Sequence, residues 1–234
     1  MRYVISDIHG HYDLFFALMK KIRYSSLDEL YICGDVIEKG PDSVKLLELI
    51  SRMPGVRCIR GNHEEAFLSY YSSLMQESAD YSAVLEKLKA YFPEDGRLLT
   101  WDLVDYLEAL PYYVETEDFI CVHAGVTLDE DGRIPPLKKI PYEEMLYSRR
   151  FKDKETLPRD SKCVFYGHTS STAVFGDVRI ALFTRDGTSP SSIRDIIKVH
   201  LDTGTFTSGV LGCFCVDTLK TYFVSKEDIK NREK

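Results

Sequence analysis

Five short apolar stretches of the sequence are each followed at once by side chains that can bind a metal ion. In chain order these segments are Asp7-Ile8-His9-Gly10, Gly34-Asp35, Gly61-Asn62-His63-Glu64, His123-Ala124-Gly125 and Gly167-His168-Thr169. They supply carboxylate, imidazole and amide oxygen and no thiolate, which suits borderline-hard divalent ions. Two such ions would lie about 3.5–4 Å apart. Positive charges that close need a bridging anion, for which Asp35 is the candidate. The residue types therefore predict a two-metal site.

The stretches that precede these segments read as β-strands, because each is too short for a typical helix and several are rich in β-branched or aromatic residues. The expected strands are Tyr3–Ser6, Leu30–Cys33, Val56–Ile59, Phe119–Val122, Cys163–Tyr166 and Val199–Leu201. Helical spacing between strands, at Leu14–Ile22 and Ser43–Arg52, predicts an α/β fold. Ligands of such folds bind beyond the carboxyl ends of the strands, and the neighbouring glycines let the backbone turn sharply there. We therefore expect one convergent site.

Three other regions have patterns of their own. Residues 64–110 are largely helical in spacing, from Ala66 to Ala90 and again from Thr100 to Leu110, and predict a helical insertion beside the sheet. Residues 127–160 are rich in Pro, Lys and Asp and are expected to be irregular. The stretch Gly209–Val224 predicts a β-hairpin around Thr218-Leu219-Lys220.

Taken together, the five segments resemble the motifs of the phosphoprotein phosphatase branch of the metallophosphoesterases, of bacterial type. Each motif alone is common, but five in the family's order, from residue 6 to residue 169, are specific. A later stretch, Leu201-Asp202-Thr203-Gly204, resembles the family's final core strand. The resemblance implies a single calcineurin-like phosphoesterase domain over residues 1–234, with the helical insertion at about 64–110. Its fold would be a β-sandwich of two mixed sheets flanked by helices, with the metal site at the carboxyl ends of the strands.

The resemblance also implies which side chains hold the metals. Asp7, His9 and Asp35 would bind one divalent ion, and the second would be bound by the shared Asp35 together with Asn62, His123 and His168. A bridging hydroxide would attack the phosphorus, because metal coordination lowers the pKa of water towards about 7. Mn²⁺ is the first expectation for both ions, with Fe or Zn²⁺ as alternatives that accept the same donors.

The remaining catalytic roles follow from the same resemblance. His63 would be the general acid that protonates the leaving oxygen, oriented by the carboxylate of Glu38. The family usually has Asp-Arg-Gly where this chain reads Glu38-Lys39-Gly40, so a point charge replaces a planar guanidinium at Lys39. Phosphate would be bound by Lys39, by Asn62 and by Arg149, with Arg150 as the alternative because the register is open by one residue.

Two enzymatic functions and one non-enzymatic function agree with these motifs. The first is hydrolysis of protein phosphomonoesters, as a serine/threonine phosphatase. The alternative is hydrolysis of dinucleoside polyphosphates such as diadenosine tetraphosphate, which uses closely similar motifs. A catalytically inactive binding module is disfavoured, because every expected ligand type is present at its place.

Several polar residues near the motifs have plainer interpretations. Glu64 and Glu65 are expected to begin the helix that follows, where acidic groups suit the helix dipole. His11 is expected on the surface of a loop and His200 as a structural residue of a strand. Arg60 is expected to brace a loop carboxylate.

Composition limits the compartment and the partners. The formal net charge of −7 argues against nucleic acid as a partner, and a phosphoprotein or small phosphate ester is expected instead. The six cysteines have no paired spacing and are expected to be free thiols. Neither a signal peptide nor an apolar run of about 18 residues is found, so we expect a cytoplasmic protein without membrane contact.

Overall fold

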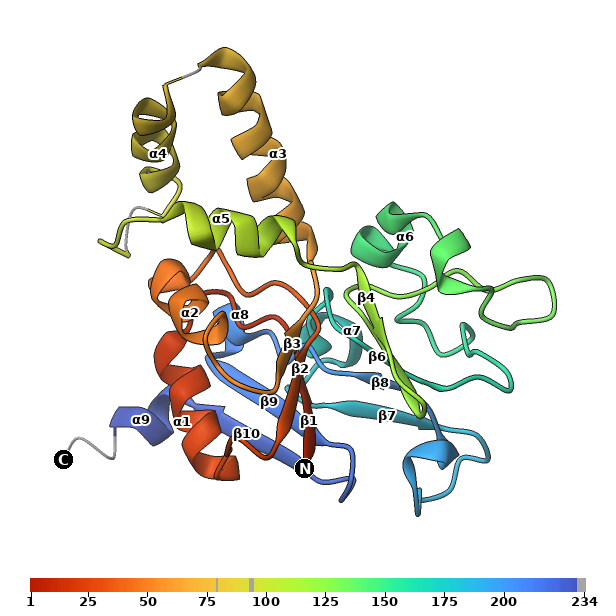
Figure 1. The fold of residues 1–234 in the computed structure, drawn as a ribbon. Coiled ribbons are helices and arrows are strands. Elements are labelled where there is room, and N and C mark those ends of the chain that lie inside the picture. Colours follow the sequence, from red (N-terminus) through yellow and green to blue (C-terminus); the bar gives the residue numbers. More distant parts are fainter. Residues whose placement is uncertain (79, 93–94, 231–234) are drawn as a thin grey trace.

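A computed structural model describes residues 1–78, 80–92 and 95–230 and contains two five-stranded sheets packed face to face (Figure 1). The first sheet has the order β10 (Thr221–Ser225), β9 (Val210–Cys215), β1 (Arg2–Ile5), β2 (Glu29–Ile32) and β3 (Val56–Cys58). The second has the order β4 (Tyr113–Glu115), β5 (Phe119–Val122), β6 (Cys163–Tyr166), β8 (Ile196–His200) and β7 (Ala181–Thr184). In the first sheet the parallel strands β1, β2 and β3 adjoin the antiparallel pair of β9 and β10, and in the second the parallel strands β5, β6 and β8 lie between the antiparallel β4 and β7. This confirms the predicted sandwich of mixed sheets.

Alternating side chains of the central strands enter different apolar cores. In β1, Val4 faces the core between the sheets, whereas Tyr3 and Ile5 pack under the helices on the outer face. In β6, Phe165 belongs to the core between the sheets and Val164 to a third core behind the second sheet. Strands covered on both faces need apolar residues at every position, which explains why they appear as unbroken apolar runs in the sequence.

Helices cover the outer face of the first sheet. They are α1 (Tyr12–Ile22), α2 (Ser43–Ile50) and the short C-terminal α9 (Lys226–Lys230). Behind the second sheet lie the 3-10 helix η1 (Leu137–Lys139) and α6 (Tyr142–Tyr147). Three short elements connect strands of the second sheet or lead back to the first: α7 (Ser171–Phe175), the 3-10 helix η2 (Ile193–Asp195) and α8 (Thr205–Ser208). No helix among the described residues is both long and apolar enough to cross a bilayer.

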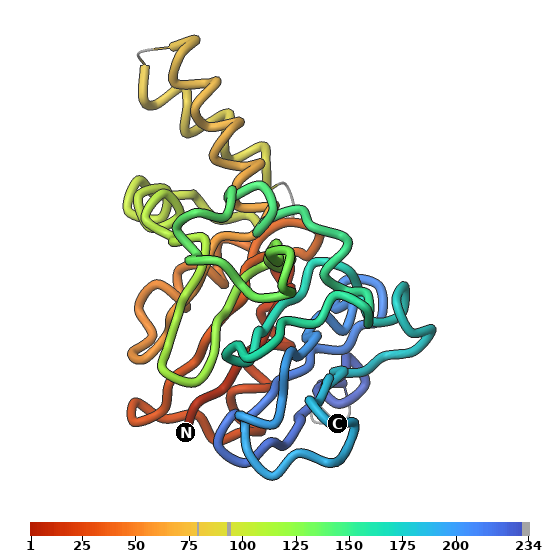
Figure 2. Tube along the Cα trace, turned by 90° about the vertical axis from the view of Figure 1, so that its right-hand side faces the viewer, coloured from red at the N-terminus to blue at the C-terminus, as the bar shows by residue number. Residues whose placement is uncertain are grey.

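The segment between β3 and β4 is helical, as its spacing predicts. It contains α3 (Asn62–Glu77), α4 (Tyr81–Lys89) and α5 (Trp101–Glu108), and Figures 1 and 2 both show α3 and α4 projecting together beyond the sheets. The helical pattern at Ala66–Ala90 corresponds to two helices, the greater part of α3 and the whole of α4. Asp80 begins α4 there, its carboxylate accepting hydrogen bonds from the backbone N–H groups of Ser82 and Ala83.

Other expectations are corrected at the edges of the second sheet. β4 and β7 were not predicted, because these short edge strands are only half-buried and lack a clear apolar run. Residues 127–160, expected to be irregular, contain η1 and α6. The predicted hairpin is confirmed, since β9 pairs with β10 and Leu219 in its turn has a left-handed backbone with φ +57°.

Candidate active site

The carboxyl ends of five parallel strands meet at one edge of the sandwich. The loops after β1 and β2 run side by side, with His9 N–H donating to the Asp35 carbonyl at 2.9 Å. The loop after β6 joins them, because the N–H of His168 donates to Oδ2 of Asp7 at 3.1 Å. The two sheets thus bring residues from distant parts of the sequence to a common point, as the strand-end pattern predicts.

One group of side chains in this edge consists of Asn62, His123 and His168. Nε2 of His123 lies 2.9 Å from Oδ1 of Asn62 and 3.2 Å from Nδ1 of His168, which is itself 2.8 Å from Oδ1 of Asn62. Nδ1 of His123 donates its proton to the Cys33 carbonyl at 2.8 Å, so Nε2 carries a lone pair. Two electron-rich atoms facing each other at 2.9 Å fit a cation between them.

A second group consists of Asp7, His9 and Asp35. Nδ1 of His9 donates to the Ile37 carbonyl at 3.2 Å, which leaves the lone pair of Nε2 directed into the site. That nitrogen lies 3.9 Å from Oδ1 of Asp7 and 3.7 Å from Oδ2 of Asp35. Backbone carbonyls that hold the far nitrogen of a ligating histidine are a common feature of metal sites.

The Asp35 carboxylate lies between the two groups. Its Oδ1 is 3.4 Å from Nε2 of His123, and its Oδ2 is the oxygen that faces His9. Ligand atoms of Asp7, Asp35 and His123, and separately of His9, Asp35 and His63, lie within 4.8 Å of one another. Each oxygen of Asp35 could therefore bind one ion of a pair.

Burial controls the protonation of this donor set. It raises the pKa of Asp35 to about 8, with a further increase from the charge of Glu64, and it raises the pKa of Asp7 to about 7. Burial also lowers the pKa of His9 to about 2 and that of His168 to about 3, so both imidazoles are neutral at physiological pH. Neutral imidazoles offer a lone pair to a metal ion. The buried carboxylates ionise with difficulty when no cation is near, so a bound divalent cation would stabilise their charged form.

The backbone of the site is strained. Six of its residues have left-handed φ angles between 50° and 72°, namely Asp7, His9, Asp35, Glu38, Lys39 and His168. Each such angle in a residue other than glycine costs about 1–3 kcal/mol, and strain of this kind is concentrated at functional sites. Packing elsewhere in the domain must maintain these angles.

At two motif positions, Gly61 and Gly167, only glycine fits, because a carboxylate of the site lies against the backbone there. A Cβ at Gly61 would lie 2.2 Å from Oδ1 of Asp35, and a Cβ at Gly167 would lie 2.0 Å from Oδ2 of Asp7. Any side chain at either position would displace a carboxylate of the site. The glycines beside the predicted ligands are therefore explained by the space that those ligands occupy.

His63 lies at the rim of the site, on the first turn of α3. Its Nδ1 is hydrogen-bonded to Oε2 of Glu38, and its Nε2 lies 3.8 Å from Oδ2 of Asp35. Burial alone would lower the pKa of His63, but the bond to Glu38 and the charge of Asp35 raise it. Burial alone would raise the pKa of Glu38, but the hydrogen bonds from His63 and from the hydroxyl of Tyr91 lower it. The structure therefore brings together the expected proton donor and the carboxylate that was expected to orient it.

The expected phosphate-binding cations lie at the mouth of the site. Lys39 is exposed, and its Nζ is 3.0 Å from Nε2 of His9. Arg149 is also exposed, and its positive charge contributes to the lowered pKa of His168. The positive charge of Arg149 therefore acts on one of the predicted metal ligands.

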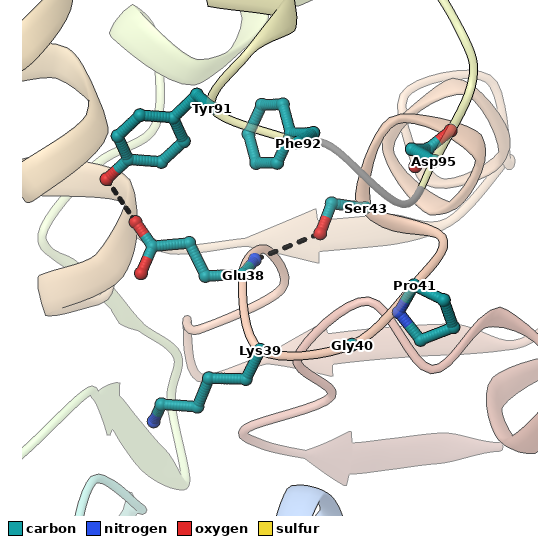
Figure 3. Close-up of a pocket in the computed structure, with 8 residues that line it drawn as sticks. All are labelled: Glu38, Lys39, Gly40, Pro41, Ser43, Tyr91, Phe92 and Asp95. Atoms are coloured by element: carbon teal, nitrogen blue, oxygen red, sulfur yellow. Dashed lines mark hydrogen bonds between the residues drawn. The ribbon is translucent and has the colours of Figure 1, made fainter.

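A pocket of about 370 Å³ opens beside the site. Figure 3 shows the turn Glu38-Lys39-Gly40 on one side of it and Tyr91 with Phe92 on the other. The helical segment between β3 and β4 therefore forms one wall of a space next to the candidate proton donor.

The sequence interpretation missed the role of Glu64. Its fully buried carboxylate accepts hydrogen bonds from the backbone N–H groups of Gly61, Asp35, Val36 and Ile37. Glu64 does lie on the first turn of α3, as expected, but its main contact is with the loop that carries Asp35. The signal was its position three residues after Gly61, where a glutamate can cap the start of a helix.

Other plain interpretations have mixed outcomes. His200 is a buried strand residue whose Nε2 bonds to the Thr169 carbonyl at 2.7 Å, in agreement with a structural role. His11 is buried, so its expected place on a loop surface is wrong. Arg60 pairs at 2.8 Å with Glu65, which belongs to α3 and not to a loop.

Asp202, in the late motif, is buried close enough to Asp7 that its pKa is raised by burial and by that charge.

All six cysteines are buried free thiols, as expected.

Comparisons with known proteins agree with this geometry. The profile of the calcineurin-like phosphoesterase family matches residues 2–197. The asymmetrical bis(5'-nucleosyl)-tetraphosphatase PrpE of Bacillus velezensis is 28% identical over 145 residues, which are 56% of this chain and 58% of that protein. The symmetrical bis(5'-nucleosyl)-tetraphosphatase of Baumannia cicadellinicola is 33% identical over 128 residues, 53% of this chain and 42% of that protein. The chain thus spans about half the length of the curated relatives it matches.

Solved structures share the fold. The crystal structure of a provisionally assigned diadenosine tetraphosphatase superposes with a TM-score of 0.70 at 18% identity, over 96% of this chain and 92% of that one. A serine/threonine phosphatase from Saccharomyces cerevisiae superposes with a TM-score of 0.56 at 14% identity, over 96% of this chain and 79% of that one. At these identities the likeness concerns the fold alone.

Proposed function

Because the chain belongs to the calcineurin-like phosphoesterase family, we propose that it is a two-metal phosphohydrolase that cleaves a dinucleoside polyphosphate. The observation that carries the proposal is the position of Asp35, whose two carboxylate oxygens face two separate groups of buried donor atoms. That arrangement fits a pair of cations joined by one carboxylate. The metal ligands are proposed to be Asp7, His9, Asp35, Asn62, His123 and His168.

Two divalent ions bound there would supply a hydroxide nucleophile near neutral pH and would offset the charge that develops on the phosphoryl oxygens. The protein's own contribution begins with orientation. The carbonyls of Ile37 and Cys33 hold His9 and His123 in the tautomers that direct their lone pairs inward. Asp7, Asp35, Asn62 and His168 complete the proposed donor set.

The cationic side chains and the histidine at the rim have separate tasks. Lys39 and Arg149, both exposed at the mouth, would bind non-bridging oxygens of the substrate's phosphates. His63 would give the proton on Nε2 to the leaving oxygen as its bond to phosphorus breaks. Glu38 keeps Nδ1 of His63 hydrogen-bonded, so that the opposite nitrogen stays directed at the site.

The choice of substrate rests on the relatives. Both curated relatives described above are named bis(5'-nucleosyl)-tetraphosphatases, although the chain spans only part of each. Their names favour the dinucleotide alternative over the protein phosphatase that the motifs suggested first. The pocket beside Glu38 and Lys39, at about 370 Å³, is in the range that accommodates part of a small molecule.

The experiment is a direct comparison of substrates. Protein supplied with Mn²⁺ at neutral pH is given diadenosine tetraphosphate or a phosphoserine peptide, and the products are separated by chromatography, with His123→Ala as the control variant. We expect nucleotide release, as ADP alone for symmetrical cleavage or as AMP with ATP for asymmetrical cleavage. Phosphate release from the peptide alone would favour the protein phosphatase, and cleavage of neither substrate would overturn the proposal.

A further inference from the structure

Tyr91 lies beside the candidate proton donor, although it follows the nearest motif, Gly61-Asn62-His63-Glu64, by 27 positions in the sequence. It follows α4 in the helical segment between β3 and β4, and its hydroxyl donates a hydrogen bond to Oε1 of Glu38, 53 positions away in the sequence. Figure 3 shows this bond reaching across the pocket. The other oxygen of the same carboxylate, Oε2, is bonded to Nδ1 of His63.

The ring of Tyr91 is held in place by other aromatic side chains. Phe67 and Phe92 each meet it edge to face with ring centroids 5.2 Å away, and Tyr70 stacks on it at 5.4 Å. Aromatic pairs at such distances contribute beyond their buried area. The hydroxyl is therefore presented to Glu38 by a packed cluster and not by a freely rotating side chain.

Glu38 needs a second support because of its length. It has one methylene more than the aspartate that is usual at this position of the motif, and hence one more rotatable bond. Its backbone is fixed, with a left-handed φ of +66° and an N–H that donates to Oγ of Ser43 at 3.0 Å. A single hydrogen bond to His63 would leave the carboxylate free to turn about that bond. The bond from Tyr91 removes this freedom, since each oxygen then has its own donor.

We propose that Tyr91 is a positioning residue that fixes Glu38, and through it His63, for protonation of the leaving group. The inference rests on the proposed phosphohydrolase function and adds to its machinery a residue that follows α4. In the step concerned, the electron pair of the breaking P–O bond stays on the leaving oxygen, and the proton on Nε2 of His63 moves to that oxygen. Tyr91 transfers no proton and does not touch the reacting atoms.

The test uses Tyr91→Phe, which retains the aromatic packing and removes only the hydroxyl. Two aryl phosphates of similar shape are compared: phenyl phosphate, whose leaving group is a weak acid, and p-nitrophenyl phosphate, whose leaving group is a much stronger acid. Only the first depends heavily on protonation. We expect kcat for phenyl phosphate to fall about tenfold, as for loss of a hydrogen bond to a charged group. KM and the turnover of p-nitrophenyl phosphate should change less than about twofold.

Tyr70→Phe is the matched control, because Tyr70 stacks on Tyr91 in the same cluster and no hydrogen bond links its hydroxyl to Glu38 among the described residues. This variant should retain wild-type kinetics with both substrates. Equal losses with both aryl phosphates in Tyr91→Phe would mean a general structural effect and would overturn the role of Tyr91. No loss with either would also overturn it.

A double-mutant cycle asks whether Tyr91 acts through Glu38. In the Glu38→Ala background, Tyr91→Phe should cause no further loss with phenyl phosphate, because the group that it positions is gone. Additive losses would contradict the inference. Wild-type protein that cleaves neither the aryl phosphates nor diadenosine tetraphosphate would instead overturn the proposed phosphohydrolase function, which keeps the two failures distinguishable.

Discussion

Glu64→Gln is the substitution whose effect can be worked out most fully from the structure. The carboxylate is fully buried and accepts four backbone N–H groups, at 2.8 Å from Gly61 and 2.9 Å from Asp35 on one oxygen, and at 2.8 Å from Val36 and 3.2 Å from Ile37 on the other. These bonds hold the loop after β2 against the start of α3. No water is needed to satisfy any of the four donors.

The magnitude follows from the number of acceptors lost. Glutamine has nearly the same shape, but it replaces one acceptor oxygen by an amide NH₂, which is itself a donor. In either orientation of the amide, two of the four N–H groups then face a donor in a buried site. Hydrogen bonds to charged groups contribute about 1.5–3 kcal/mol each, so the free energy of unfolding should fall by about 3–6 kcal/mol. Small domains are stable by about 5–15 kcal/mol in total, so this loss is large.

The assay is urea unfolding, combined with a titration of Mn²⁺ into metal-free protein. The same substitution should weaken metal binding, because Glu64 holds the N–H of Asp35 and the N–H of Ile37, whose carbonyl orients His9. Glu65→Gln is the matched control on the neighbouring position. Its carboxylate pairs with Arg60, whose guanidinium also donates to two backbone carbonyls, so this substitution should cost less stability than Glu64→Gln.

The reasoning would be refuted by a Glu64→Gln protein whose unfolding free energy and Mn²⁺ affinity both lie within error of the wild type. The same holds if Glu65→Gln is as destabilising as Glu64→Gln. Either result would mean that the four bonds do not hold the loop in place.

Further predictions concern the metals, the proton donor and a buried lysine. Asp35→Asn should lose both ions and all turnover while remaining folded, as measured by metal analysis and circular dichroism. His63→Asn should retain the ions but lower kcat by about 10²–10⁴-fold. Metal-free protein should lose stability as the pH rises from about 4 to about 8, because only its folded form keeps protons on Asp7 and Asp35 over that range. Metal affinity should instead increase with pH, and calorimetry should detect protons released when the metal binds. Lys198→Met should lower the unfolding free energy by about 2–4 kcal/mol, since the buried ammonium donates to three carbonyls of the loop that follows Arg149.

Much of the fold follows from local sequence pattern. Central strands such as β5 and β6 are covered on both faces, and this requirement leaves an unbroken apolar run that can be recognised without a structure. The hairpin of β9 and β10 is equally local. The edge strands β4 and β7 escape recognition, because a half-exposed edge places little restriction on residue type.

The candidate site divides in the same way. Asp7, Asp35 and His123 were identified from their places directly after strands, because the carboxyl ends of parallel strands converge whatever the loops do. The choice between Arg149 and Arg150 stays a prediction, since a register of one residue in an exposed segment leaves no mark in the sequence.

The sequence by itself determined the chemistry of this protein: the donor types, their order and the strand ends that carry them. Only the tertiary structure decided how those donors are supported. Glu64 reaches the loop of Asp35 across 29 positions, and Tyr91 reaches Glu38 across 53. Periodicity and turn preference act over a few residues, whereas such contacts depend on how whole helices pack against the sheets, and no local pattern records them.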